Sequence, residues 1–176
     1  METSHKLHLI TGEGKGKTSA SMGMALRMLG HEGSVLIAQF MKDGSSGELK
    51  ALQRFPLCHI FEGLRFEGFA WQLSDKDIHL ARAAYADAIK ALESEVAWLK
   101  PRLLVLDELN VTLAMNLTQW EDAIRLIDLG LQFGDVVVTG RYASPRMEAK
   151  ADYVSLIQAK KHPFDEGEAA REGIEW

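Results

Sequence analysis

The sequence predicts an α/β protein built on a mostly parallel β-sheet with helices on both faces. Three observations lead to this prediction. Short unbroken apolar runs recur along the chain, as is typical of strands buried on both faces. Stretches with helical apolar spacing separate these runs, and glycines or prolines mark most of the boundaries. Strands that alternate with helices imply parallel neighbours joined by right-handed crossovers.

The size and composition fit one globular nucleotide-binding domain over residues 1–176. The chain is 47% hydrophobic and 26% charged, and its net charge of −5 gives no overall positive field to attract nucleic acid or an anionic membrane. The one cysteine, Cys58, cannot form an internal disulfide. No apolar run approaches the length of a signal segment or a membrane span. We therefore expect a cytoplasmic protein with no nucleic-acid or membrane partner.

The elements of the first half follow from apolar runs punctuated by glycines. The unbroken run that ends at Phe40 is typical of a strand covered on both sides. In chain order we expect a strand at 6–11, a helix at 17–29 stopped by Gly30, a strand at 34–40, a loop at 41–46, a helix at 47–55, a strand at 58–61 and a Gly-rich aromatic segment at 62–73.

The second half carries stronger helical signals. Apolar residues from Ile78 to Leu99 recur at spacings of three and four, which predicts one face of a long helix. In chain order we expect a helix capped by Ser74 that ends before Pro101, a strand at 103–106, a helix from a capping box of Thr118 and Glu121 to about Phe133, closed by Gly134, a strand at 135–139, a brief helix opened by Pro145 and a last strand at 153–157.

The segment TGEGKGKT at 11–18 lies between the first strand and the first helix, where a phosphate-binding loop belongs. Its glycines let backbone N–H groups point at phosphate oxygens, and the helix N-terminus adds a partial positive charge. Lys17 can neutralise the outer phosphates, and Thr18 can offer its hydroxyl to Mg²⁺. Thr11 stands where the strict pattern has a glycine, so the loop is a shortened variant. The alternative interpretation is a flexible Gly-rich turn.

The apolar strand at 103–106 runs straight into Asp107 and Glu108. An acidic residue at the end of a buried strand is costly to desolvate unless a cation or hydrogen bonds compensate it. Such a strand is typical of the second nucleotide-site motif, which delivers a carboxylate to the metal. A helix cap is the alternative, and the phosphate loop earlier in the chain favours the metal role.

Three large aromatic residues, Phe66, Phe69 and Trp71, lie in a segment with no helical or strand period. Aromatic side chains in such a segment form either a hydrophobic latch onto the domain or a surface for a flat ligand. Composition alone favours the latch.

Taken together and in order, these motifs resemble the ATP:co(I)rrinoid adenosyltransferase family of P-loop type. The resemblance runs along almost the whole chain, although Asn110 stands where a threonine is frequent, and longer members carry an extension before the first strand. The segments that carry it are TGEGKGKTS at 11–19, QFMK at 39–42 followed by Gly47-Glu48, FAW at 69–71, LDEL at 106–109, TGR at 139–141 and KHPFDEG at 161–167.

The resemblance implies a P-loop NTPase-like (RecA-like) fold and an alkyl-group transferase. The enzyme would move the 5′-deoxyadenosyl group of ATP to the Co(I) of a corrinoid, with triphosphate as the leaving group and ATP bound in the reversed sense. It also implies a homodimer and a reduced flavoprotein as electron donor. The implied nucleotide-binding residues are Gly12, Glu13, Gly14, Lys15, Gly16, Lys17, Thr18, Ser19, Lys42 and Arg141; the implied Mg²⁺ ligands are Thr18, Asp107 and Glu108; and the implied catalytic residues are Lys17, Glu108, Phe69 and Trp71.

Two other functions stay open on the sequence. The first is a P-loop kinase or ATPase with ATP in the usual orientation, although no acceptor-positioning base separates itself from the other carboxylates. The second is a non-catalytic module that binds ATP and a corrinoid without turnover. A coupled spectral assay with ATP, Mg²⁺ and reduced cobalamin would separate all three functions.

Overall fold

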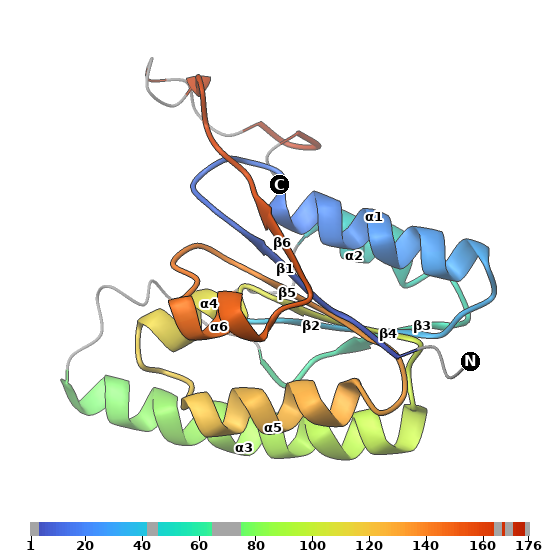
Figure 1. The fold of residues 1–176 in the computed structure, drawn as a ribbon, viewed down its shortest axis with the longest axis horizontal. Helices are drawn as coiled ribbons and strands as arrows, with labels where there is room; N and C mark the ends of the chain where they lie inside the picture. The colour runs from blue at the N-terminus through green and yellow to red at the C-terminus, as the bar shows by residue number, and fades with distance from the viewer. Residues whose placement is uncertain (1–3, 42–45, 65–74, 164–166, 168–170, 175–176) are drawn as a thin grey trace.

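A six-stranded sheet in which every pair of neighbours is parallel forms the centre of the protein (Figure 1). The structure is a computed structural model that describes residues 4–41, 46–64, 75–163, 167 and 171–174. The strand order is β3-β2-β4-β5-β1-β6, which confirms the predicted α/β class. The strands are β1 (Leu7–Thr11), β2 (Val35–Gln39), β3 (Cys58–Phe61), β4 (Leu103–Asp107), β5 (Asp135–Thr139) and β6 (Tyr153–Leu156).

Helices cover both faces of this sheet. Figure 1 shows α1 and α2 on one face, with α3, α4, α5 and α6 on the other. The helices are α1 (Lys17–Gly30), α2 (Gly47–Leu52), α3 (Asp75–Leu99), α4 (Leu109–Ala114), α5 (Trp120–Gly130) and α6 (Pro145–Lys150). Among the helices of the described ranges, none combines the length and the apolar composition that crossing a bilayer requires.

The strand side chains divide into two apolar layers because successive residues of a strand point to opposite faces. Ile37 and Val105 are fully buried in the layer under α1 and α2. Leu36 and Leu104 are equally buried in the layer under α3 and α5. Burial on both faces is the reason that the strands read as unbroken apolar runs.

The same alternation decides where the polar ends of the strands lie. Gln39, Asp107 and Thr139 follow Ile37, Val105 and Val137 by two residues, so these three polar side chains project from the α1 face. The register pairs Gln39 with Asp107 across β2 and β4. Three neighbouring strands, β2, β4 and β5, therefore bring their polar ends together at the carboxyl ends of the strands, where ligands of open α/β sheets bind.

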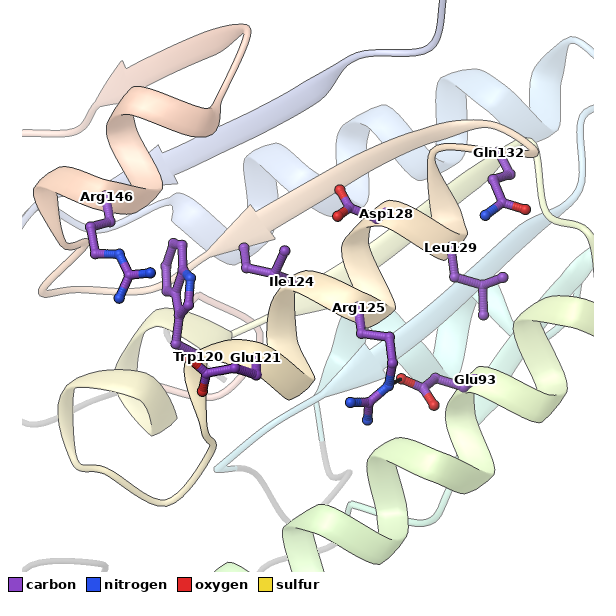
Figure 2. Close-up of a pocket in the computed structure, with 9 residues that line it drawn as sticks. All are labelled: Glu93, Trp120, Glu121, Ile124, Arg125, Asp128, Leu129, Gln132 and Arg146. Carbon is purple, nitrogen blue, oxygen red and sulfur yellow. Dashed lines mark hydrogen bonds and ion pairs between the residues drawn. The ribbon is translucent and has the colours of Figure 1, made fainter.

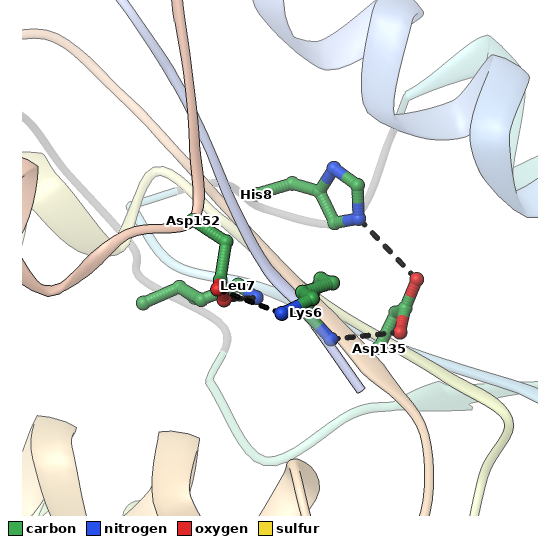
Figure 3. A network of polar contacts seen from close by, with 5 residues as sticks. All are labelled: Lys6, Leu7, His8, Asp135 and Asp152. Carbon is green, nitrogen blue, oxygen red and sulfur yellow. Dashed lines mark hydrogen bonds and ion pairs between the residues drawn. The ribbon is translucent and has the colours of Figure 1, made fainter. Parts of the chain in front are cut away.

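A polar network lies at the opposite end of the sheet, where β1, β5 and β6 begin (Figure 3). Asp135 accepts a hydrogen bond from the backbone N–H of Lys6 at 2.9 Å, and it lies 3.3 Å from the ring Nε2 of His8. Asp152 accepts from the backbone N–H of Leu7 at 2.9 Å and from Lys6 Nζ at 3.2 Å. These two carboxylates fix the start of β1 against β5 and β6, at the end of the sheet away from the phosphate loop.

Three predictions in the second half were wrong. The prediction missed α4, whose six residues are too few to show a helical period. The capping box was also wrong. The N-cap of α5 is Gln119, and the hydroxyl of Thr118 is buried without a hydrogen-bond partner. The helix ends at Gly130, three residues before the predicted end, and a turn leads from there into β5.

Candidate functional site

The loop between β1 and α1 has a shape that favours glycine at several positions. Gly12 and Gly16 have φ angles of +105° and +113°, which lie outside the region that L side chains adopt readily. A Cβ atom built on Gly12 would lie 2.3 Å from the carbonyl oxygen of Ile157. At Gly14 the added Cβ would lie 2.8 Å from the backbone of Gln158. The loop therefore packs closely against the chain that follows β6.

Lys17 folds back into this loop. It is 6% exposed, and its Nζ donates hydrogen bonds to the carbonyl oxygens of Gly12 at 2.7 Å and Gly14 at 2.8 Å. Burial lowers the pKa of the ammonium group below its ordinary value, and the nearby carboxylate of Glu108 opposes that shift. The loop thus holds a poorly hydrated cation beside the N-terminus of α1.

The N-terminus of α1 also favours an anion at this place. Gly16 is its N-cap and has no side chain to accept a hydrogen bond from the first turn, and that turn contains no acidic residue. The first N–H groups of a helix otherwise lack partners, and they carry the positive end of the helix dipole. The first turn of this 14-residue helix is therefore suited to an anion.

Asp107 occupies the centre of a cluster on the α1 face of the sheet. Its side chain is fully buried. Its carboxylate accepts hydrogen bonds from Thr18 Oγ1 at 3.0 and 3.2 Å, from Gln39 Nε2 at 2.9 Å and from Thr139 Oγ1 at 2.5 Å. These donors come from α1, β2 and β5, so the carboxylate joins the phosphate loop to two neighbouring strands.

Glu108 leaves the sheet through a left-handed backbone conformation, with φ of +64°. Its backbone N–H donates to Thr139 Oγ1 at 3.0 Å, and Thr139 in turn donates to Asp107. A Cβ on Gly140 would lie 3.2 Å from a carboxylate oxygen of Glu108, so the glycine keeps this space open. Backbone strain of this kind is concentrated at functional sites. The two acidic residues thus face different surroundings, one inside the cluster and one at its rim.

This group of side chains fits a magnesium ion. Thr18 and Asp107 offer oxygen atoms, which are the ligands that Mg²⁺ prefers, and they lie beside the anion-binding end of α1. The described part of the chain contains no cluster of three or more His, Cys, Asp or Glu side chains that could enclose a metal alone. Magnesium in nucleotide sites does not need such a cluster, because it binds one or two protein groups and completes its shell with phosphates and water.

Exposed polar pairs surround the loop. Arg141 lies 3.3 Å from Glu13, and both side chains are at least half exposed. Ser19 Oγ donates to Glu48 at 3.2 Å. Ion pairs exposed to this degree contribute little to stability, so the contact between Arg141 and Glu13 can open at small cost.

The structure brings most of the predicted site together. Gly12 to Ser19, Asp107, Glu108 and Arg141 lie around the same edge of the sheet. Lys42, Phe69 and Trp71 lie outside the described residues, so their roles stay predictions. Gln39 and Thr139 lie in two of the segments that carry the family resemblance, but sequence reasoning gave neither residue a role in the site. Both are polar residues that end buried strands, and this is the signal that would have indicated a role.

A groove elsewhere on the surface is not connected with this site (Figure 2). It has a volume of about 720 Å³ and lies along α5, beside α3 and α6. Both of its arginines already have partners, because Arg125 contacts Glu93 at 2.7 Å and Arg146 lies over the Trp120 ring at 4.4 Å from its centroid. We therefore assign no ligand to this groove.

The parallel sheet, the glycine loop and the lysine and threonine that open α1 together define a P-loop nucleotide-binding protein. Comparison with known proteins narrows this class. The family model described as "ATP:corrinoid adenosyltransferase BtuR/CobO/CobP" matches residues 3–176, and the chain belongs to this family of transferases. The predicted family resemblance is therefore confirmed.

Curated relatives agree with the family model. The chain is 37% identical over 170 residues to the corrinoid adenosyltransferase of Pseudomonas aeruginosa, covering 94% of this chain and 81% of that protein. It is 30% identical over 175 residues to "Corrinoid adenosyltransferase CobA" of Salmonella typhimurium, covering 96% and 84% of the two chains. The corrinoid adenosyltransferase of Escherichia coli K12 matches at the same identity and coverage.

Proposed function

We propose that this protein transfers the 5′-deoxyadenosyl group of ATP to the Co(I) centre of a corrinoid and releases triphosphate. Family membership supports the substrate classes. The observation that carries the proposal is Lys17, a buried ammonium group held inside the glycine loop by two carbonyl oxygens. A cation at the mouth of an uncapped helix N-terminus is suited to hold a polyphosphate.

The loop would act by stabilising negative charge on the departing triphosphate. Lys17 would exchange the carbonyl oxygens of Gly12 and Gly14 for phosphate oxygens, and Lys15 and Arg141 would add charge at the rim. Thr18 would hold Mg²⁺ with Asp107 or Glu108. When bound, the metal neutralises phosphate charge as a Lewis acid.

The reaction differs from phosphoryl transfer in the atom attacked. An electron pair of Co(I) forms a cobalt–carbon bond to the ribose C5′, the bond from C5′ to oxygen breaks, and its electron pair leaves with triphosphate. We propose that ATP lies in the reversed sense, so that C5′ faces the corrinoid. Co(I) is a very strong nucleophile, and no general base is required at the attacking atom.

We assign Phe69 and Trp71 to the corrinoid side of the site. By family resemblance, these aromatic residues would displace the lower axial ligand of cobalt and exclude water, which makes the reduction of Co(II) easier. Lys42 would contribute to nucleotide binding from the loop after β2. We further propose that a reduced flavoprotein supplies the electron, and that the chain acts in the cytoplasm as a homodimer of one-domain subunits.

The products formed from ATP test this function. Purified protein would be incubated with ATP, Mg²⁺ and chemically reduced cob(I)alamin, and the phosphate products separated by ion-exchange chromatography. We expect triphosphate in a one-to-one ratio with adenosylcobalamin, which is detected by its absorbance. ADP with inorganic phosphate would indicate a kinase or ATPase instead. Binding of both substrates without turnover would indicate a non-catalytic module.

The aromatic pair has a separate test. Trp71→Ala should greatly slow adenosylation that starts from Co(II) with a reductant, because the axial ligand then stays on cobalt. Affinity for ATP, measured by calorimetry, should be unchanged, because Trp71 is assigned to the corrinoid and not to the nucleotide. Unchanged turnover from Co(II) would return both aromatic residues to the role of a hydrophobic latch.

A further inference from the structure

Gln39 leaves a polar atom unsatisfied inside the candidate metal site. The residue ends β2, is 6% exposed and lies beside Asp107 in the register of the sheet. Its Nε2 donates to Asp107 Oδ2 at 2.9 Å, whereas its Oε1 is buried and has no hydrogen-bond partner. The amide cannot be reversed, because its oxygen would then face the carboxylate. The acceptor is therefore held in place without a donor.

Buried acceptors without donors are rare in folded proteins, and each calls for an explanation. Two further buried oxygen atoms of the described residues also lack partners, namely Asn110 Oδ1 and Thr118 Oγ1. Of these three side chains, Gln39 is the one with a recorded hydrogen bond to Asp107. Its unpartnered oxygen therefore belongs to a side chain that is hydrogen-bonded to one of the two candidate metal carboxylates.

The reach of the amide agrees with a role at that cation. The oxygen and nitrogen of an amide lie about 2.2 Å apart, so Gln39 Oε1 lies within about 5 Å of Asp107 Oδ2. Neighbouring ligands of an octahedral Mg²⁺ lie about 3 Å from one another. A water molecule bound to a cation on Asp107 can therefore also lie within hydrogen-bond distance of Gln39 Oε1.

We propose that Gln39 is a positioning residue of the metal site, whose Nε2 orients Asp107 while its Oε1 accepts a hydrogen bond from a water molecule on the Mg²⁺ that accompanies ATP. The inference rests on the proposed function, because it requires Mg²⁺ and ATP to bind at the phosphate loop. It adds a residue that acts through the carboxylate and a water molecule and contacts neither substrate.

The test separates metal binding from nucleotide binding. Calorimetry would give the affinity of the full chain for ATP in EDTA and across a Mg²⁺ titration, for wild type, Gln39→Met and Gln39→Leu. Met and Leu are close to Gln in size, and each removes both the donor to Asp107 and the acceptor oxygen. Thr118→Val is the matched control, because it removes another buried orphan oxygen, and the backbone N–H of Thr118 bonds Thr112, away from the acidic pair.

We expect Gln39→Met to raise the Mg²⁺ concentration for half-maximal effect by about 10–100-fold, as loss of an outer-sphere partner does, with ATP affinity in EDTA changed less than about twofold. Thr118→Val should keep the Mg²⁺ response of wild type within about threefold. Gln39→Leu should behave like Gln39→Met, and it supplies the test if Gln39→Met does not fold.

An unchanged Mg²⁺ response in folded Gln39→Met would overturn the inference. So would an equal loss of ATP affinity with and without Mg²⁺, which indicates a purely structural role, or an equal loss of Mg²⁺ response in Thr118→Val. A wild-type chain that fails to bind ATP would overturn the proposed function itself. That result differs from all the others, because it appears before any substitution is made.

Discussion

Replacement of Gly12 by alanine is the sharpest steric test of the phosphate loop. The substitution adds one methyl group to a residue with φ of +105°. The new Cβ would lie 2.3 Å from the carbonyl oxygen of Ile157, closer than real Cβ atoms approach other heavy atoms. The oxygen of Ile157 is a backbone atom, and the position of a Cβ atom is fixed by its own backbone. No side-chain rotation therefore relieves the contact, and the loop must move away from the segment after β6.

The cost can be estimated from two contributions. Holding alanine in a conformation that favours glycine costs about 1–3 kcal/mol. Separating the loop from Ile157 threatens two hydrogen bonds, from Gly14 N to Ile157 O at 2.9 Å and from Ile157 N to Thr11 O at 2.8 Å. Each contributes about 0.5–1.5 kcal/mol, so Gly12→Ala should lower the free energy of unfolding by about 2–6 kcal/mol.

Two other glycines provide matched controls. Gly16 has φ of +113° but open space around an added Cβ, so Gly16→Ala should cost the conformational part alone, about 1–3 kcal/mol. Gly23 lies within α1 with open space and ordinary φ, so Gly23→Ala should stabilise the protein by about 0.5–1 kcal/mol.

Urea unfolding would rank these variants, and calorimetry would measure their affinity for ATP. The expected order of stability is Gly23→Ala, wild type, Gly16→Ala, Gly12→Ala, with ATP affinity lost in the last. If Gly12→Ala proved as stable as Gly16→Ala, the close packing of the loop against Ile157 would be refuted as its source of shape.

Three further predictions concern other side chains. Lys17→Met should weaken ATP binding by about 10–150-fold in calorimetry, because it removes hydrogen bonds to a charged group worth about 1.5–3 kcal/mol; binding at wild-type affinity would exclude the proposed phosphate contact. Thr139→Val should lower the free energy of unfolding in urea by about 1–3 kcal/mol, because Asp107 loses a donor and a backbone N–H loses its acceptor; an unchanged value would contradict the role of this hydroxyl. Hydrogen bonds from the backbone N–H of Leu7 and from the side chain of Lys6 lower the pKa of the Asp152 carboxyl group. The contribution of Asp152 to stability is therefore complete above the unfolded pKa of about 3.9. It is lost as the pH falls through the folded pKa. The stability difference between wild type and Asp152→Asn, from urea unfolding at pH 3 to 7, should therefore shrink below about pH 4, and a difference that grows toward acid would reverse this sign.

Local signals were enough to predict the strands and the long helices. The run at 103–106 is apolar because β4 is buried on both faces, so the residue types alone predict its burial. The same holds for the spacing of apolar residues in α3. Thr118 shows where such signals fail: its sequence matches a capping box, but the turn after α4 buries its hydroxyl and moves the cap to Gln119.

The residues of the candidate site likewise divide into those that local sequence signals indicated and those that only tertiary contacts revealed. The amino-acid sequence alone determined the phosphate loop and the acidic strand end, because the glycines, Lys17 and Asp107 are residue types that this chemistry requires at those places. Only the tertiary structure decided that Gln39 and Thr139 bond the same carboxylate as Thr18. These contacts join residues that are far apart in the chain, and they depend on strand order and register, which no local pattern encodes.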